Sequence, residues 1–215
     1  MRLSLFDLDG TLIDSEEGIT RSIEYALARL DVPAPPRAVL RTWIGPPLRA
    51  TFPTVVGDDP ETVERAVAAY RERFVDVGWR EHRVYDGIVE VIEALAARGD
   101  RLAVVTTKPA VYAEPIVASL PFGACFERIY TAPPKSAGSE KAAMIARALD
   151  DFGVGPAQAV MVGDRRFDIE GALANGVRAV GAAWGFGSTE ELDEAGADAI
   201  ADVPASLPAM LGCPA

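Results

Sequence analysis

The chain of 215 residues contains little cysteine, little lysine and a single histidine. Its two cysteines, Cys125 and Cys213, stand apart without CxxC spacing, so we expect free thiols rather than a disulfide, and a reducing, cytoplasmic setting. No run of about 18 apolar residues occurs, and therefore no membrane-spanning helix is predicted. The net charge of −11 argues against nucleic acid or an acidic membrane surface as a partner, because binding many phosphates requires a basic face.

The first apolar run ends in a pair of carboxylates. Leu3–Phe6 predicts a buried strand, and Asp7 and Asp9 follow it. Residues i and i+2 of a strand point the same way, so both carboxylates can face one site at the carboxyl edge of a sheet. Such a pair repels unless a cation lies between the two or one is protonated, and phosphoryl-transfer enzymes with Mg²⁺ and an aspartate nucleophile use both remedies. Gly10 allows a sharp turn, and Thr11 offers a hydroxyl and an exposed N–H. The alternative interpretation is an ordinary acidic turn at a strand end.

Residues 15–85 show helical patterns and no strand pattern. Ser15 and Asp59 are the predicted N-caps of two helices in this stretch. From residue 86 onward, apolar runs alternate with helical segments of about a dozen residues, which predicts a parallel sheet with helices on both faces. The expected fold is α/β, with a Rossmann-like core formed by residues 1–14 and 86–215 and an inserted α-helical cap domain formed by residues 15–85. The later strands are expected at 101–106, 128–131, 159–162, 177–181 and, more weakly, 197–200.

Polar residues follow two of these expected strands. Thr106, Thr107 and Lys108 lie between a strand end and a helix start, an arrangement that predicts a phosphate-binding corner. Alternatively, the threonines only cap the helix. Asp164 and Asp168 follow the next-but-one strand, and carboxylate oxygens are ligands that Mg²⁺ prefers. The alternative is that Asp164 is an N-cap and Asp168 lies on a solvated helix face.

The chain has only three lysines, Lys108, Lys135 and Lys141. Lys141 is expected in the first turn of a helix, where a positive charge opposes the helix dipole unless it is needed elsewhere. Lysines usually lie on the surface, but two of these three follow strands at the expected active edge. Their distribution therefore favours a site.

In chain order, these motifs resemble the four motifs of the haloacid dehalogenase (HAD) superfamily: Asp7–Thr11, Thr106, Lys141, and Gly163-Asp164 with Asp168. The resemblance covers nearly the whole chain. The helical insertion is similar to the small α-helical cap of the phosphoglycolate phosphatase-like group. The resemblance implies a Mg²⁺-dependent phosphatase that acts on a small phosphorylated metabolite through an aspartyl-phosphate.

The resemblance also implies roles for single residues. Asp7 would be the nucleophile, and Asp9 would be the general acid and base. Mg²⁺ would be held by Asp7, the backbone carbonyl of Asp9 and Asp164, with Asp168 supporting them. Thr106 would hold the phosphoryl oxygens and Lys141 would offset their charge, with Lys135 as the alternative lysine. Further phosphate or substrate contacts would come from Gly10, Thr11, Thr107, Lys108 and, in the cap, Arg49, whose alternative fate is a solvated helix charge.

Departures from the superfamily narrow the activity. Dehalogenases lack the second acidic residue that Asp9 supplies, and phosphonoacetaldehyde hydrolases need a cap lysine that is absent between Ser15 and Tyr85. The histidine of mutase-like members is replaced at about Ile19, and the only histidine is His82. These departures leave a phosphatase.

Within the phosphatase interpretation, phosphoglycolate-type or broad small-metabolite activity is preferred, and a 5′-nucleotidase or a pyrophosphatase is the alternative. A non-enzymatic phospho-receiver domain is the rival of a different class, but receivers carry their phosphoacceptor on a mid-chain strand. A nucleotide-binding module is disfavoured because neither GxGxxG nor GxxxxGK[ST] occurs. We expect a monomer or a homodimer.

Overall fold

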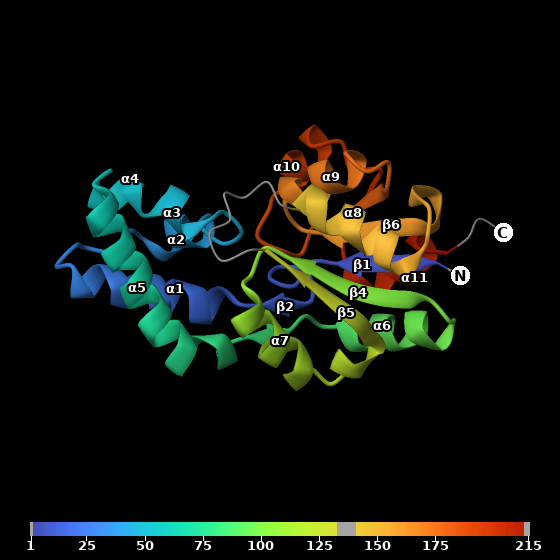
Figure 1. The fold of residues 1–215 in the computed structure, drawn as a ribbon, viewed down its shortest axis with the longest axis horizontal. Coiled ribbons are helices and arrows are strands. Elements are labelled where there is room, and N and C mark those ends of the chain that lie inside the picture. Colours follow the sequence, from blue (N-terminus) through green and yellow to red (C-terminus); the bar gives the residue numbers. More distant parts are fainter. Residues whose placement is uncertain (1, 133–140, 213–215) are drawn as a thin grey trace. The chain divides into compact units, whose positions relative to one another are not determined.

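The computed structural model describes residues 2–132 and 141–212 and divides into two compact units (Figure 1). The α/β unit comprises Met1–Asp14 and Val84–Ala215, and the helical unit comprises Ser15–Arg83. The sequence placed the second boundary after Tyr85, slightly later than this division. Cys125 is a free cysteine, whereas Cys213 lies outside the described residues.

The α/β unit is built on a six-stranded sheet of order β5-β4-β1-β6-β7-β8, in which all neighbours are parallel. The first strand is central, because β1 pairs with β4 on one side and β6 on the other. Its last residue, Phe6, is opposite Val104 and Val162. The strands are β1 (Leu3–Phe6), β4 (Arg101–Thr106), β5 (Phe126–Thr131), β6 (Ala159–Gly163), β7 (Arg178–Ala182) and β8 (Ala199–Ala201).

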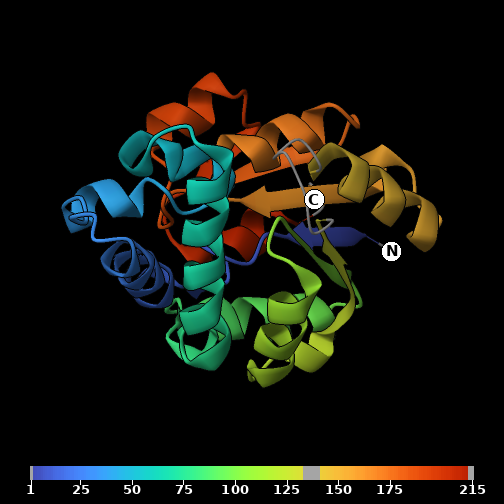
Figure 2. The ribbon, with the colours of Figure 1, turned by 60° about the vertical axis from the view of Figure 1, so that its left-hand side comes forward.

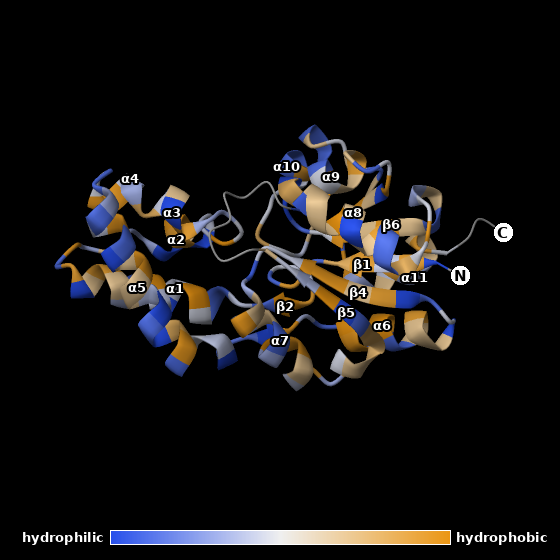
Figure 3. Cartoon of the chain, viewed as in Figure 1, coloured by the Kyte–Doolittle hydropathy of each residue, from blue (hydrophilic) through white to orange (hydrophobic). Residues whose placement is uncertain are grey.

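Helices cover both faces of this sheet, which confirms the predicted fold class (Figures 1 and 2). One face carries α8 (Lys141–Phe152), α9 (Arg166–Leu173) and α10 (Thr189–Glu194), and the other carries α6 (Ile88–Ala97) and α7 (Ala110–Ser119), with α11 (Leu207–Met210) against α6. Leu3 and Leu5 of β1 share one buried core with Ile145 of α8 and Ile169 of α9. The central strands β1, β4 and β6 are correspondingly hydrophobic (Figure 3), as burial on both faces requires.

The helical unit contains α1 (Glu16–Arg29), α2 (Arg37–Arg41), α3 (Leu48–Thr51), α4 (Pro53–Val56), α5 (Pro60–Asp76) and a 3₁₀ turn, Gly78–Arg80. Its two long helices, α1 and α5, pack together. Ile23 and Leu27 of α1 are buried, as are Val67 and Phe74 of α5, so each helix turns one apolar stripe inward. Among the described residues, no helix is long and apolar enough to cross a membrane.

Two helix starts behave differently from each other. Asp59 caps α5 as predicted, because its carboxylate accepts a hydrogen bond from the Thr62 N–H at 2.9 Å. Ser15 precedes α1, but its side chain makes no capping hydrogen bond, so the prediction of a capping serine was wrong in this respect. The short helices α3 and α4 were not predicted, since four residues are too few to show a 3.6-residue period. The small sheet of β2 (Ile13–Asp14) and β3 (Arg83–Val84) was also missed.

Candidate active site

Three carboxylates meet at the carboxyl edge of the large sheet. Asp7 follows β1, Asp164 follows β6, and Asp168 lies in the first turn of α9. Because β1 and β6 are adjacent, parallel and in register, their ends bring Asp7 and Asp164 to one place. Each of the three residues offers an oxygen, all within 4.8 Å of one another. The predicted juxtaposition is therefore present in the structure.

Lys141 joins this group from the first residue of α8. Its Nζ donates to Asp7 Oδ1 at 2.8 Å and to the Val105 carbonyl at 2.8 Å, and lies 2.7 Å from Asp168 Oδ1. The side chain is only 4% exposed, so these contacts replace its water. The unfavourable place of this lysine in the helix dipole is thus compensated by two carboxylates. The alternative candidate, Lys135, lies outside the described residues.

The second carboxylate of the opening motif has its own lysine. Lys108 Nζ donates to both oxygens of Asp9, at 3.0 and 2.8 Å. The Lys108 backbone N–H donates to Thr106 Oγ1 at 3.1 Å, inside the protein. The structure therefore places Thr106, Lys108 and Asp9 in one chain of contacts, while Thr107 is partly exposed beside it. The sequence predicted phosphate contacts for Thr106, Thr107 and Lys108. It did not predict the ion pair between Lys108 and Asp9.

Glycines make room for the carboxylates. Gly10 has a φ of +87°, and a Cβ there would lie 2.1 Å from Asp164 Oδ2. A Cβ on Gly163 would lie 2.2 Å from Asp168 Cγ, and one on Gly185 would lie 2.3 Å from Asp164 Cβ. Atoms at such distances overlap, so each of these positions excludes a side chain. Gly10 is therefore required for steric reasons as well as for the sharp turn that the sequence predicted.

Asp164 is held by groups from two loops. The Phe186 N–H donates to its Oδ2 at 2.8 Å, and Thr11 Oγ1 donates to its Oδ1 at 3.4 Å. The exposed N–H predicted for Thr11 was wrong: the residue is fully buried, and its N–H donates to the Leu8 carbonyl at 3.4 Å. The Gly10 N–H is likewise used within the loop, by the Ile13 carbonyl at 2.8 Å. Sequence reasoning missed Phe186 altogether.

The more ordinary interpretations of these motifs do not hold. The N-cap residue of α9 is Arg165, not Asp164, and Asp168 is 1% exposed rather than solvated. Neither Thr106 nor Thr107 caps α7, whose N-cap position is Pro109. The buried carboxylates consequently need a different explanation, because an ion is expensive to bury unless it is paired or binds a metal.

Arg49 lies in the helical unit and is engaged there. Its Nε and Nη2 donate to the two carboxylate oxygens of Glu64 at 2.5 and 2.8 Å. This contact joins α3 to α5 in a bidentate pair. The substrate contact predicted for Arg49 stays a prediction.

The pKa values of the site reflect crowded negative charge. Burial raises the pKa of Asp7 to about 7, and the Asp168 and Asp9 carboxylates act in the same direction, against the opposing effect of Lys141. Burial, together with the Asp7 and Asp168 carboxylates, also raises the pKa of Asp164 well above its usual value. For Lys141, burial acts to lower the pKa, but the Asp168 and Asp7 carboxylates outweigh it and raise the pKa above its usual value. The site accordingly favours any further positive charge.

A magnesium ion fits these residues. Among the residues that the structure describes, four carboxylates share this edge with two lysines, which leaves two negative charges unmatched by a described lysine: Asp7, Asp9, Asp164 and Asp168 against Lys108 and Lys141. The three clustered carboxylates offer oxygens alone, which are the ligands of Mg²⁺, and one divalent ion would balance the charge. Asp7, Asp164 and Asp168 are thus the residues that could hold it.

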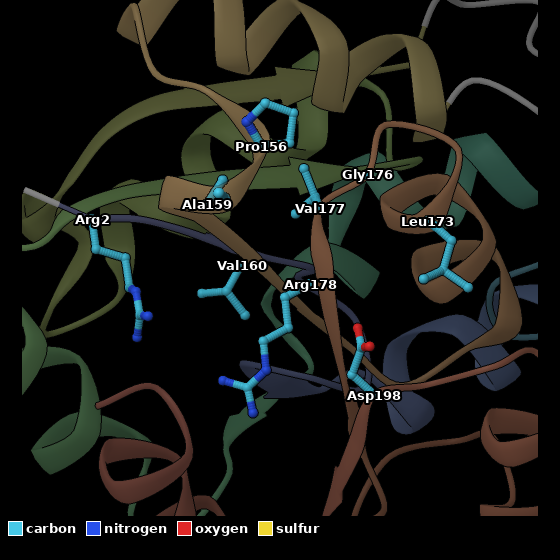
Figure 4. Close-up of a pocket in the computed structure, with 10 residues that line it drawn as sticks. Arg2, Pro156, Ala159, Val160, Leu173, Gly176, Val177, Arg178 and Asp198 are labelled. Carbon is cyan, nitrogen blue, oxygen red and sulfur yellow. The ribbon is translucent and has the colours of Figure 1, made fainter. Parts of the chain in front are cut away.

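A pocket of about 380 Å³ lies elsewhere in the α/β unit (Figure 4). It is lined by Arg2, Val160, Arg178 and neighbouring residues at the amino ends of β1, β6 and β7. The carboxylates lie at the carboxyl ends of the same strands. Arg178 Nη1 donates to the Met210 carbonyl at 2.6 Å, and Arg2 Nη1 donates to the Leu211 carbonyl. These guanidinium groups hold the end of α11.

Comparison with known proteins supports the family resemblance that the sequence motifs predicted. The family model described as haloacid dehalogenase-like hydrolase matches residues 4–182. A 5′-nucleotidase of Pseudomonas aeruginosa is 45% identical over 188 residues, covering 87% of this chain and 85% of that protein. A phosphoglycolate phosphatase of Pectobacterium atrosepticum is 31% identical, covering 96% of this chain and 91% of that protein. The chain also resembles a protein named tyrosine-protein kinase PtkA in Mycobacterium tuberculosis, at 35% identity over 90% of this chain and 66% of that protein.

Solved structures share the fold over the full length. A haloacid dehalogenase-like hydrolase from Streptococcus pneumoniae superposes with a TM-score of 0.92 at 32% identity, covering 99% of each chain.

Proposed function

Because the chain belongs to the haloacid dehalogenase-like hydrolases and is a phosphatase of that family, we propose that it hydrolyses a small phosphate monoester with Mg²⁺ through an aspartyl-phosphate on Asp7. The observation that carries this proposal is the position of Asp7. One of its oxygens is bound by Lys141 at 2.8 Å, and the carboxylates of Asp164 and Asp168 lie beside it. Asp7 is thus a buried carboxylate with a cation on one side and a metal-ligand cluster on the other.

In the proposed first step, an Asp7 oxygen attacks phosphorus and the bond from phosphorus to the ester oxygen breaks. Asp9 gives its proton to that ester oxygen, so the alcohol leaves neutral. In the second step, water attacks the aspartyl-phosphate, Asp9 takes a proton from the water, and the bond from phosphorus to the Asp7 oxygen breaks. The products are an alcohol and inorganic phosphate, and Asp7 is regenerated.

Other residues of the edge would support the charge that moves in these steps. Lys141, fixed by Asp7, Asp168 and the Val105 carbonyl, keeps a positive charge where the phosphoryl oxygens arrive. Bound Mg²⁺ would supply the remaining positive charge and act as a Lewis acid towards the phosphate. Thr106 would hold a phosphoryl oxygen, and the N–H groups beside it would assist. We propose Asp164 and Asp168, with Asp7 and the Asp9 backbone carbonyl, as the magnesium-binding residues.

Two substrate classes have specific support. A nucleoside monophosphate is favoured by the 45% identical relative named 5′-nucleotidase, and phosphoglycolate is favoured by the 31% identical relative of that name. Both are phosphate monoesters of an alcohol, so the proposed chemistry is the same for either. From the net charge of −11 we also propose that the partners are small phosphorylated metabolites and not nucleic acid or anionic membranes.

The test is phosphate release from nucleoside monophosphates, phosphoglycolate, sugar phosphates, pyrophosphate and p-nitrophenyl phosphate, with Mg²⁺ and with a chelator. We expect Mg²⁺-dependent release and a loss of at least about 10³-fold in kcat for Asp7→Asn, because the nucleophile is removed. Stable phosphorylation of the wild type without turnover would instead indicate a phospho-receiver. Activity that survives Asp7→Asn would contradict the proposed nucleophile.

A further inference from the structure

Lys108 and Asp9 form a close ion pair at the carboxyl edge of the sheet. Its ammonium lies 2.8 and 3.0 Å from the two oxygens of that carboxylate, and the side chains of Lys108 and Asp9 are 7% and 13% exposed. A pair with so little water around it is held more firmly than a surface ion pair. The Asp9 side chain is therefore fixed in direction.

The backbone that presents Lys108 is also fixed. The Lys108 N–H donates to Thr106 Oγ1 at 3.1 Å, and Thr106 is 1% exposed at the end of β4. Thr106 thus ties the first residues after the strand to the rigid sheet. A lysine stem has several rotatable bonds, and anchoring its backbone is one way to define where the ammonium can reach.

We propose that Lys108 is the positioning residue for Asp9, with Thr106 as its anchor. This inference rests on the proposed function, in which Asp9 delivers a proton to the ester oxygen. A proton donor acts efficiently only when it is aligned with the accepting atom. Lys108 holds the Asp9 carboxylate at the edge beside Asp7, so that the proton reaches the leaving oxygen as its bond to phosphorus breaks. The lysine itself exchanges no proton in either step.

The two lysines of the site contact different carboxylates, so we expect their loss to affect different steps. Lys141 contacts Asp7 and Asp168, whereas Lys108 contacts Asp9. Loss of Lys141 would therefore affect transfer of the phosphoryl group from every ester. Loss of Lys108 should affect only esters whose leaving oxygen needs a proton.

The experiment compares Lys108→Met with the wild type in single-turnover cleavage of two esters. One is p-nitrophenyl phosphate, whose leaving oxygen departs without a proton, and the other is adenosine 5′-monophosphate, whose leaving alkoxide needs one. We expect cleavage of the nucleotide to slow by about 10- to 100-fold in Lys108→Met. Nitrophenolate release should change by less than about threefold, and the KM for the nucleotide should stay within about twofold.

The ratio of the two rates is measured in one protein preparation, so it does not depend on the fraction that folds. Lys108→Arg should restore part of the ratio, because it keeps a cation near Asp9. Arg101→Met is the matched control: it removes an ion pair with Glu127 (2.7 Å) outside the site, and the ratio should stay at the wild-type value.

Equal slowing of both esters, or a rise in KM alone, would overturn the positioning role and make Lys108 a phosphate or substrate contact. Failure of the proposed function would show itself differently, as activity that persists in Asp7→Asn. The two failures are thus distinguishable.

Discussion

The helical unit and the active edge of the α/β unit both use ion pairs, but of different kinds. In the helical unit, Arg73 donates to both oxygens of Glu81 at 2.8 and 3.0 Å, with about a sixth of each side chain exposed (17% and 18%). At the active edge, Lys141 and Asp7 are 4% and 11% exposed. The guanidinium fork fits one carboxylate and joins two segments, whereas the lysine ammonium is a compact charge that contacts several groups. In these pairs the arginine links two segments of the helical unit, whereas the lysine contacts the clustered carboxylates.

The largest difference in stability and activity is expected between two variants that each remove one cation, one at the carboxylate edge and one in the helical unit. Lys141→Met leaves Asp7 and Asp168 buried without their ammonium, and should lower the free energy of unfolding by about 3–5 kcal/mol and kcat by at least about 10²-fold. Arg49→Met breaks a partly exposed pair and should cost no more than about 1 kcal/mol. Urea denaturation and steady-state phosphate release measure both effects. An equal loss of unfolding free energy in the two variants would contradict the difference between buried lysine pairs and partly exposed arginine pairs.

Two glycines with similar positive φ values are expected to give effects of intermediate size. Gly10 and Gly57 have φ values of +87° and +83°, but a Cβ on Gly57 would meet nothing within 4 Å, whereas one on Gly10 would meet Asp164 at 2.1 Å. Gly57→Ala should therefore cost only the strain of its backbone conformation, about 1–3 kcal/mol. Gly10→Ala should cost more and should abolish the rise in melting temperature that Mg²⁺ produces. An unchanged Mg²⁺ response in Gly10→Ala would show that Asp164 does not bind the metal.

The smallest effects concern pH, and the two units should respond in opposite directions. Arg73 and Arg21 lower the pKa of Glu81 below its usual value of 4.5. The unfolded chain then binds the proton more readily, so the stability from this pair is present above pH 4.5 and is lost as pH falls through the folded pKa. Glu81→Gln should flatten the acid side of the stability curve.

For Asp7 the sign reverses. Burial raises its pKa from 3.8 to about 7, so in the metal-free protein the folded state binds the proton more readily. Stability from this group is then full below pH 3.8 and falls as pH rises towards 7. Asp7→Asn should flatten that range in a chelator while leaving the acid side unchanged. Urea midpoints between pH 3.5 and pH 8 measure both slopes, and slopes of the same sign would contradict the assignment.

Much of the site was readable from the sequence, because strand ends in a parallel sheet converge. Asp7 and Asp164 each follow an apolar run, and this placement together with the resemblance to the superfamily's four motifs predicted that they meet; the register of β1 and β6 places them together. Lys141 stood out because lysine is rare in this chain and unfavourable at a helix start. In each case a pattern among neighbouring residues indicated a side chain at the carboxyl edge of the sheet.

The remaining contacts depend on close tertiary approach, which no local pattern encodes. Phe186 contributes a backbone N–H to Asp164, and its side-chain identity gives no hint of that. The only signal was the glycine-rich stretch around it, in which Gly185 must lie against Asp164. The partner of Lys108 was hidden for a similar reason: a long flexible side chain at a strand end can point to the substrate or to Asp9, and only the assembled edge selects the latter.

The central position of β1 has a consequence for synthesis of the protein. β1 precedes both of its partner strands in the chain, and it pairs with β4 and β6 in the registers Leu3 with Arg101 and Leu3 with Ala159. The helical unit, Ser15–Arg83, is complete in sequence before either partner strand has been made. The nascent chain therefore carries an apolar strand with two open edges until β4 has been made, and with one open edge until β6 has been made, a hazard for aggregation. Asp7 gains its neighbours Lys141 and Asp164 only after the helical unit and β4 have been made, so the carboxylate edge forms long after β1 itself has been synthesised.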